Sequence, residues 1–239
     1  MQQYYLNNEL EHSVSIKDTR FHYLKNVIRI KKEEHILLFN GINKAEYQIL
    51  EINKSDIKAQ KIRNLKNNNH KLEITLLTGV LKKDNTELVI QKSVELGINK
   101  IILTKFINSV ARIDNKEEKK LQRYNEIALS ACEQSKRDTI ASVEYLDLLK
   151  KLEFKLYDKI YLLYEQENNI NSLYKEINNC SKQDKILLIV GPEGGFDVKE
   201  LDYFQENKIT FTSLGTNILR SETAAIMSVG LTINIMNNK

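Results

Sequence analysis

The sequence predicts an α/β domain built on a mainly parallel β-sheet, preceded by a smaller β-rich domain. From residue 71 onward, short apolar segments typical of buried strands alternate with helical segments. Period-two alternation of apolar side chains is confined to residues 35–65. The polar stretch "KNNNH", residues 66–70, separates the two patterns and is typical of a linker. We therefore expect one domain over residues 1–68 and another over residues 71–239.

The composition is that of a globular protein with an uneven charge. Of its 239 residues 41% are hydrophobic, and no apolar run approaches the roughly 20 residues that a membrane span needs. The N-terminus lacks the pattern of a secretory signal, so we expect a cytoplasmic protein with no membrane partner. The net charge of +4 arises within residues 1–70, which favours a polyanionic partner there, although a mildly basic solvated surface would look the same.

Residue types that form disulfides or bind metals are sparse and unsuitably spaced. Cys132 and Cys180 stand apart in helix-like sequence, which indicates buried thiols in a reducing compartment. All four histidines fall within the first 70 residues, without the HxxxH or HExxH spacing of zinc sites. We therefore expect no metal site, and chemistry without histidine in the second domain.

The first domain is expected to contain a helix and several strands. Residues 19–30 place apolar side chains at helical spacing, which predicts that they face the core. These side chains are Phe21, Leu24, Val27 and Ile28. The segments "HILLFNG", "AEYQILEIN" and "DIKAQKIRNL" then alternate between turn residues, which predicts a small antiparallel sheet or barrel.

The second domain begins with a predicted strand over residues 72–80 and a helix whose start carries Asp84 and Glu87 as a capping box. A strand over residues 100–106 and a long helix over residues 116–136 follow. Three more doubly buried strands, each followed by helical sequence, are predicted over residues 159–164, 185–190 and 209–214. Ligands of such sheets bind beyond the carboxyl ends of the strands.

Three loops follow these last three strands and are the candidate ligand-binding loops. They are the first loop, "YEQENN" (164–169), the middle loop, "GPEGGF" (191–196), and the third loop, "GTNILRSETAA" (215–225). Glycines in the middle loop let backbone amides approach a ligand closely, although they could simply form a tight turn. Asp197 and Glu200 are placed to cap the next helix. The glycine spacing fits neither a Walker loop nor a dinucleotide fingerprint.

In the third loop, Arg220, Ser221 and Glu222 stand where a helix is expected to begin. Ser221 could be only an N-cap, and Glu222 only a favourable charge in the first turn. Helix capping by its neighbours does not explain the presence of Arg220. This favours a ligand-binding or catalytic role for Arg220.

Taken together, these motifs resemble the signature of a known family. "GPEGGF" followed by "LGTNILRSETA" is similar to the motif pair of the bacterial 16S small-subunit rRNA (uracil-N3) methyltransferases, which belong to the SPOUT superfamily. The resemblance extends over nearly the whole chain. It includes Lys82, Glu87, Gln91, Lys92, Glu95 and Gly97, then Glu133, Gln134, Ser135 and Arg137, and, near the front, His22, Leu24, Val27 and Arg29.

The resemblance implies a trefoil-knot methyltransferase domain after a PUA-like RNA-binding domain, and a homodimer that acts on 16S rRNA or the small ribosomal subunit. It implies that the knot loops hold S-adenosyl-L-methionine. The expected cofactor-binding residues are Leu163, Tyr164, Glu165, Val190, Gly191, Pro192, Gly194, Gly195, Leu214, Gly215, Asn217, Ile218 and Leu219. The expected RNA contacts are His22, Arg29, Lys82 and Arg137.

The implied reaction assigns roles to three ionisable residues. N3 of uracil must lose its imide proton, and a cation near the uracil oxygens, here Arg220, would stabilise the developing charge. Glu193 or Glu222 is the expected proton acceptor, with water as the alternative. The signature loops contain no cysteine, which disfavours methylation at C5. The rival interpretations are another SPOUT methyltransferase, acting on ribose 2′-OH or on transfer RNA, and a non-catalytic RNA-binding assembly factor.

Overall fold

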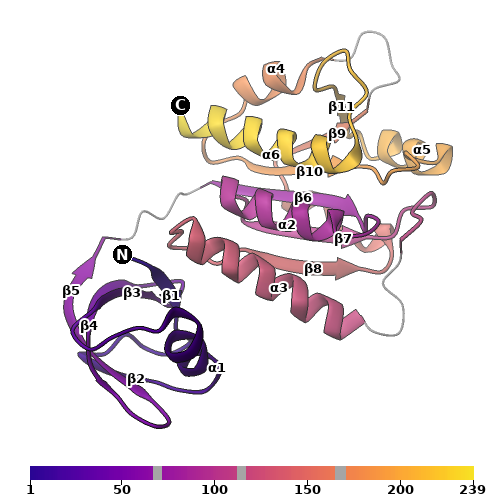
Figure 1. The fold of residues 1–239 in the computed structure, drawn as a ribbon. Coiled ribbons are helices and arrows are strands. Elements are labelled where there is room, and N and C mark those ends of the chain that lie inside the picture. The colour runs from indigo at the N-terminus through magenta and orange to yellow at the C-terminus, as the bar shows by residue number, and fades with distance from the viewer. Residues whose placement is uncertain (67–71, 112–116, 165–170) are drawn as a thin grey trace. The chain divides into compact units, whose positions relative to one another are not determined.

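The computed structural model describes residues 1–66, 72–111, 117–164 and 171–239, and the chain divides into two compact units. The first unit comprises Met1–Asn69 together with Cys132–Ile140. The second unit comprises His70–Ala131 together with Ala141–Lys239. Each unit contains a β-sheet of its own, and Figure 1 shows the sheet of the first unit in indigo to purple.

The first unit is built on a five-stranded sheet with the strand order β1-β3-β4-β5-β2. The strands are β1 (Gln3–Tyr5), β2 (Ser13–Ile16), β3 (His35–Phe39), β4 (Lys44–Ile52) and β5 (Ile57–Leu65). β1 runs parallel to β3, and the other pairs are antiparallel. The predicted antiparallel sheet is confirmed for β3 to β5. Sequence reasoning missed β1 and β2, because strands of three and four residues are too short to show a period.

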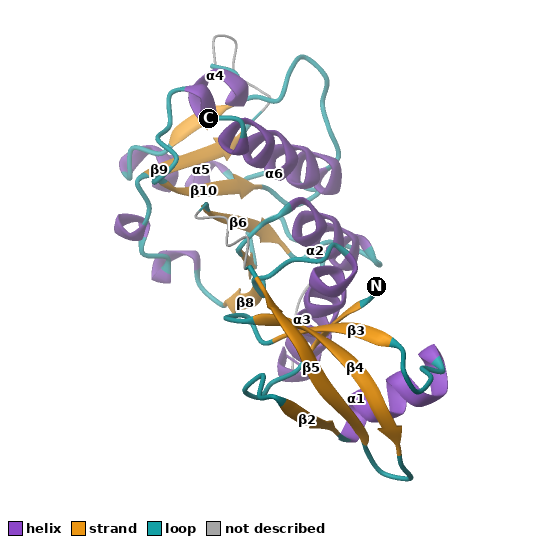
Figure 2. Ribbon diagram, turned by 90° about the vertical axis from the view of Figure 1, so that its left-hand side faces the viewer, coloured by secondary structure: helices purple, strands orange, loops and turns teal. Residues whose placement is uncertain are grey.

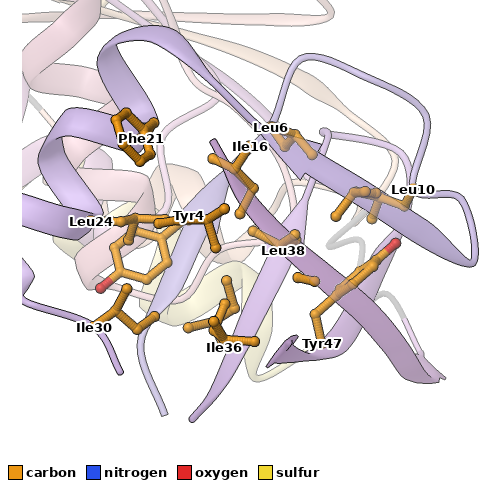
Figure 3. Close-up of a cluster of buried hydrophobic side chains, with 14 of the residues drawn as sticks. Tyr4, Leu6, Leu10, Ile16, Phe21, Leu24, Ile30, Ile36, Leu38 and Tyr47 are labelled. Atoms are coloured by element: carbon orange, nitrogen blue, oxygen red, sulfur yellow. The ribbon is translucent and has the colours of Figure 1, made fainter. Parts of the chain in front are cut away.

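A helical segment packs into the same core as these strands. It consists of α1 (Asp18–His22) and the π-helix η1 (Tyr23–Ile28). Figure 3 shows Phe21 and Leu24 in one buried cluster with strand residues such as Leu38. The prediction that Val27 faces the core is wrong, since Val27 is 65% exposed. A π-helix bonds residue i to i+5 and so changes the spacing. The same prediction is confirmed for Ile28, which packs against the cluster.

The second unit contains a six-stranded sheet, ordered β11-β9-β10-β6-β7-β8, in which all neighbouring strands are parallel. The strands are β6 (Glu73–Gly79), β7 (Lys100–Thr104), β8 (Ser142–Leu146), β9 (Lys159–Leu163), β10 (Lys185–Val190) and β11 (Thr210–Thr212). The predicted α/β fold with a mainly parallel sheet is confirmed. β8 was not predicted, because "SVEYL" is a half-polar strand at the edge of the sheet.

Helices and short 3₁₀ turns cover this sheet. They are α2 (Asn85–Leu96), α3 (Glu117–Gln134), α4 (Leu173–Asn178), α5 (Val198–Glu206), α6 (Ser221–Asn237), η2 (Leu149–Lys151) and η3 (Phe154–Leu156). Figures 1 and 2 show α2, α3 and α6 on one face of the sheet. Side chains of the other face, among them Leu162 and Leu187, pack with Phe204 of α5 and with Leu152 in a buried cluster. Burial on both faces explains why these strands are continuously apolar.

The start of α2 differs from the prediction. Asp84 makes no side-chain cap hydrogen bond, so the predicted capping box is wrong. The hydroxyl of Thr86 accepts from the N–H of Leu81 at 2.8 Å and donates to the carbonyl of Leu81 at 3.2 Å. Glu87 pairs with Arg123 of α3 at 2.9 Å. A buried hydroxyl thus closes the turn, because it can satisfy both backbone groups of Leu81 where water has no access.

The register of the parallel strands brings several strand ends to one edge of the sheet. Val190, the last residue of β10, pairs with Leu163 at the end of β9 and with Thr78 near the end of β6. Leu163 is also aligned with Thr212, the last residue of β11. The loops that follow these strands therefore leave the sheet at the same edge, which is where ligands of parallel sheets bind.

Candidate functional site

A cavity of about 520 Å³ lies at these strand ends. All the predicted cofactor-binding residues that the structure describes line it: Leu163, Tyr164, Val190, Gly191, Pro192, Gly194, Gly195, Leu214, Gly215, Asn217, Ile218 and Leu219. Glu165 lies outside the described residues. The structure therefore brings together residues from all three candidate loops.

The three predicted catalytic residues line the same cavity. Arg220 and Glu193 are exposed, and Glu222 is half-buried. Within the described parts of the chain, none of the three forms an ion pair with another residue. One cation and two carboxylates are thus available to a ligand in this cavity.

Sequence reasoning missed several residues of the cavity wall. These are Lys83, Asn85, Phe196, Ser213, Ser221 as a wall residue, and Ala224. Lys83 lies in the turn between β6 and α2, which also contributes the predicted RNA contact Lys82, and Asn85 is the first residue of α2. The position of this turn after the carboxyl end of a parallel strand is the signal that could have identified it.

A hydrogen bond joins the third loop to the middle loop. α6 begins at Ser221, and its N-cap residue, Arg220, makes no side-chain cap. The hydroxyl of Ser221 donates to the carbonyl of Gly191 at 2.5 Å. The interpretation of Ser221 as an N-cap is therefore wrong. Glu222 does lie in the first turn of α6, where its negative charge is favourable.

The glycines of the loops meet different requirements. A Cβ added to Gly194 would lie 2.7 Å from the carbonyl oxygen of Asn108, so the neighbouring loop requires glycine there. Gly195 and Gly215 have φ values of +70° and +134°, and a Cβ on either would meet nothing within 4 Å. Both line the cavity, so their backbone leaves room for a ligand.

The end of the middle loop is braced by Glu200, which is only 6% exposed. Its carboxylate accepts from the N–H of Asp197 at 3.0 Å and from the N–H of Ile107 at 2.8 Å. Asp197 in turn accepts from the N–H of Lys199 at 3.0 Å. The predicted capping box of Asp197 and Glu200 is confirmed, and it also holds the loop that follows β7.

Glu193 connects the middle loop to the turn between β6 and α2. Its Oε1 accepts a hydrogen bond of 2.7 Å from the backbone N–H of Lys82, 111 residues away in the sequence. The predicted proton acceptor is therefore also a structural link between two walls of the cavity.

The other predicted RNA contacts belong to the first unit and do not line the cavity. His22 and Arg29 are exposed and lie on either side of η1. Arg137 is half-buried, and this burial lowers the pKa of its guanidinium. The guanidinium of Arg137 donates to the hydroxyl of Thr139 at 3.2 Å.

Charged contacts account for the membership of Cys132–Ile140 in the first unit. Arg20 pairs with Glu133 at 2.6 Å, and their side chains are 21% and 11% exposed. Lys44 pairs with Asp138 at 2.8 Å, and their side chains are 11% and 5% exposed. Since removing one partner would leave a nearly buried charge unpaired, these pairs hold the segment firmly to the unit.

The described ranges contain no cluster of three or more His, Cys, Asp or Glu side chains arranged to hold a metal ion. No described helix combines the length and the apolar character needed to cross a membrane.

A parallel sheet with a ligand-sized cavity at its strand ends places the second unit among α/β ligand-binding domains. Comparison with known families identifies the family. Residues 68–233 match the RNA methyltransferase domain family, and residues 16–62 match the RNA methyltransferase PUA domain family. The chain belongs to this family of RNA methyltransferases, with a PUA domain in its N-terminal part.

Individual relatives resemble the chain over nearly its whole length. It is 33% identical to the ribosomal RNA small subunit methyltransferase E of Rickettsia conorii, over 94% of this chain and 92% of the relative. It is 32% identical to the protein of the same name from Mesomycoplasma hyopneumoniae, over 95% of this chain and 96% of the relative. A crystal structure of the Neisseria gonorrhoeae ribosomal RNA small subunit methyltransferase E bound to S-adenosyl methionine is 29% identical, with a TM-score of 0.82 and 96% coverage of both chains.

Proposed function

We propose that the protein transfers a methyl group from S-adenosyl-L-methionine to N3 of a uridine in the 16S RNA of the small ribosomal subunit. The observation that carries this proposal is the cavity at the strand ends, whose wall combines the three loops with Arg220, Glu193 and Glu222. The relatives from Rickettsia and Mesomycoplasma support small-subunit ribosomal RNA as the substrate. The Neisseria structure supports the cofactor.

The residues of the cavity fit this cofactor. A volume of about 520 Å³ lies within the roughly 300–1,000 Å³ of small-molecule sites. Leu163, Val190 and Leu219 offer apolar surface for the adenine ring, next to backbone groups for its polar edge. Gly195 and Gly215 leave open space where other residues would carry a side chain.

The reaction forms a bond between N3 of uracil and the methyl carbon while the bond between that carbon and sulfur breaks, and the N3 proton passes to a base. The cofactor supplies the electrophilic methyl group. Loops held together by hydrogen bonds would fix the acceptor near the methyl group, which is a large part of the acceleration in such transfers. We assign Arg220 to the negative charge on the uracil oxygens. Glu193 and Glu222 are the candidate proton acceptors, with water as the alternative.

We propose that the first unit supplies RNA contacts through His22, Arg29 and Arg137. Two other cations there are already engaged: Arg20 pairs with Glu133, and Lys25 donates to the carbonyl of Asn53 at 2.8 Å. The side chains of His22 and Arg29 are exposed and form no hydrogen bond or ion pair with any described residue, so both are available to phosphates or bases. The fourth proposed RNA contact, Lys82, belongs to the second unit and lines the cavity.

We further propose a cytoplasmic homodimer with sequence domains over residues 1–68 and 71–239, the second of them knotted, and with Cys132–Ile140 of the second domain packed into the first unit. The matches of residues 16–62 and 68–233 to separate families support the domain division. The implied knot and dimer stay predictions from the resemblance. Light scattering in solution tests the dimer, for which we expect twice the chain mass of 27.8 kDa.

Mass spectrometry of small-subunit rRNA from cells with and without the protein tests the proposed reaction. We expect N3-methyluridine to disappear at one site when the protein is absent, and to return with the wild-type protein. Loss of a 2′-O-methyl group or of a transfer RNA modification would point to another RNA methyltransferase. An unchanged modification profile of all RNA would favour a non-catalytic assembly factor.

A further inference from the structure

A turn outside the proposed cofactor-binding loops forms part of the cavity wall. This lysine turn, Leu81–Asn85, contributes Lys82, Lys83 and Asn85 to the wall. Its backbone path is constrained at its first residue and at its middle residue. Leu81 is 2% exposed and is bound through both of its backbone groups by Thr86, while Lys83 adopts a left-handed φ of +53°.

The lysine turn is tied to the middle loop by Glu193. The carboxylate accepts the 2.7 Å hydrogen bond from the N–H of Lys82, which connects the turn directly to the loop. The middle loop itself is held by the hydrogen bond from Ser221 to Gly191 and by the close approach of Gly194 to Asn108. Through Glu193, the position of the lysine turn is therefore set relative to the cofactor-binding loops.

The polar side chains that the lysine turn presents to the cavity have no partner among the described residues. Lys82 and Lys83 are exposed, Asn85 is half-buried, and none of the three side chains bonds to another residue in the described ranges. Asp84, the one acidic residue of the turn, does not line the cavity. Two lysines on one cavity wall favour an anion such as an RNA phosphate, and a side-chain amide can donate to a carbonyl oxygen of a base.

We propose, on the basis of the function proposed above, that the lysine turn is the subsite for the target nucleotide of the RNA. Lys82 and Lys83 bind the phosphates that flank the uridine, and the amide of Asn85 donates to a carbonyl oxygen of the uracil. Glu193 is a positioning residue that holds the turn beside the cofactor, which leaves the N3 proton to Glu222 or to water.

A pair of glycine variants tests the phosphate contact. Lys83→Gly removes the ammonium group, and glycine suits the left-handed backbone, so the fold should be kept. Lys208→Gly is the matched control, because Lys208 is also exposed, has a φ of +58° and lies outside the cavity wall. With isolated small ribosomal subunits, KM should rise about tenfold in Lys83→Gly, which corresponds to about 1.4 kcal/mol. The slope of log KM against log salt should also fall by about 0.7.

The same assay with Asn85→Ala should give a higher KM for the subunit. In both turn variants, calorimetry should find a Kd for S-adenosylmethionine within about twofold of wild type, since a base or phosphate contact does not touch the cofactor. A subunit KM and salt slope in Lys83→Gly equal to those of Lys208→Gly, in an enzyme that methylates the subunit, would overturn the subsite and leave the proposed function standing. A wild-type protein that binds the cofactor but methylates no small subunit would overturn the proposed function, and the subsite with it.

Two substitutions separate the positioning role of Glu193 from that of a base. Glu193→Gln keeps an oxygen that accepts from the N–H of Lys82 but cannot take a proton, whereas Glu193→Ala loses both abilities. We expect Glu193→Ala to raise the subunit KM about tenfold and Glu193→Gln to restore most of this loss. A fall in kcat of about 10²-fold or more in both variants would identify Glu193 as the base and overturn its positioning role.

Discussion

The hydroxyl of Ser221 donates a hydrogen bond of 2.5 Å to the carbonyl of Gly191. It connects the first residue of α6 to the first residue after β10, 30 residues earlier in the chain. Because both loops line the cavity, this bond sets the spacing between two of its walls.

Ser221→Ala removes this connection. We expect the free energy of unfolding to fall by about 1 kcal/mol, the usual net contribution of one hydrogen bond, and the affinity for S-adenosylmethionine to fall several-fold. Urea denaturation and calorimetry measure the two effects. Thr223→Ala is the control, since Thr223 is exposed on the same helix and lines no part of the cavity. Equal cofactor affinity in the two variants would contradict the role given to Ser221.

Substitutions at Gly194 and Gly195 should differ in severity. A Cβ at residue 194 would lie 2.7 Å from the backbone oxygen of Asn108, so Gly194→Ala must move one of two packed loops. Gly195→Ala meets no atom and costs only the left-handed conformation, about 1–2 kcal/mol. We expect a lower thermal midpoint and weaker cofactor binding in Gly194→Ala than in Gly195→Ala, and no cofactor binding in Gly194→Val. The reverse order would show that Gly195 is the more constrained position.

Arg220→Ala should lower turnover and leave the fold intact. Arg220 is exposed and makes no side-chain cap on α6, so its removal breaks no side-chain hydrogen bond or ion pair among the described residues. If its charge stabilises the uracil oxygens, kcat should fall by about 10²-fold or more, while the Kd for S-adenosylmethionine changes little. Single-turnover kinetics on small subunits measures this. Full turnover in the variant would exclude the role.

The first unit should lose stability in acid because of Glu46. Its carboxylate lies 2.7 Å from Nδ1 of His35 and accepts from Nε of Arg63 at 2.7 Å. These two hydrogen bonds, that of His35 first, hold the pKa of Glu46 below its ordinary value of 4.5. A lowered pKa stabilises the fold above pH 4.5, and this contribution is lost as the pH falls through the folded-state value. Denaturation between pH 3 and 6 should therefore show a weaker pH dependence in Glu46→Gln than in wild type.

Much of the second unit could be predicted from local sequence. Strands such as "KILLIV" are continuously apolar because both faces are buried, and the loops after them were expected to meet because parallel strands end at a common edge. Asp197 and Glu200 form the predicted capping box because such a box is a contact within four residues.

The errors arose where distant residues decide the local structure. Val27 was expected in the core, but the π-helical turn changes the spacing on which that expectation rested. The bond between Glu193 and Lys82 spans 111 residues, and no periodicity within either segment reveals it. The pair between Glu133 and Arg20, 113 residues earlier, was not predicted for the same reason.

Because Cys132–Ile140 belong to the first unit, that unit cannot be completed when residues 1–66 leave the ribosome. Arg20 and Lys44 can form their ion pairs only after Glu133 and Asp138 have been translated, 113 and 94 residues later. By then β6, β7 and most of α3 have been synthesised, so the first unit can be completed only after part of the second unit has been made. The same interleaving means that no single proteolytic cut can release either unit whole, and that the N-terminal RNA-binding part cannot be exchanged between relatives as one contiguous cassette.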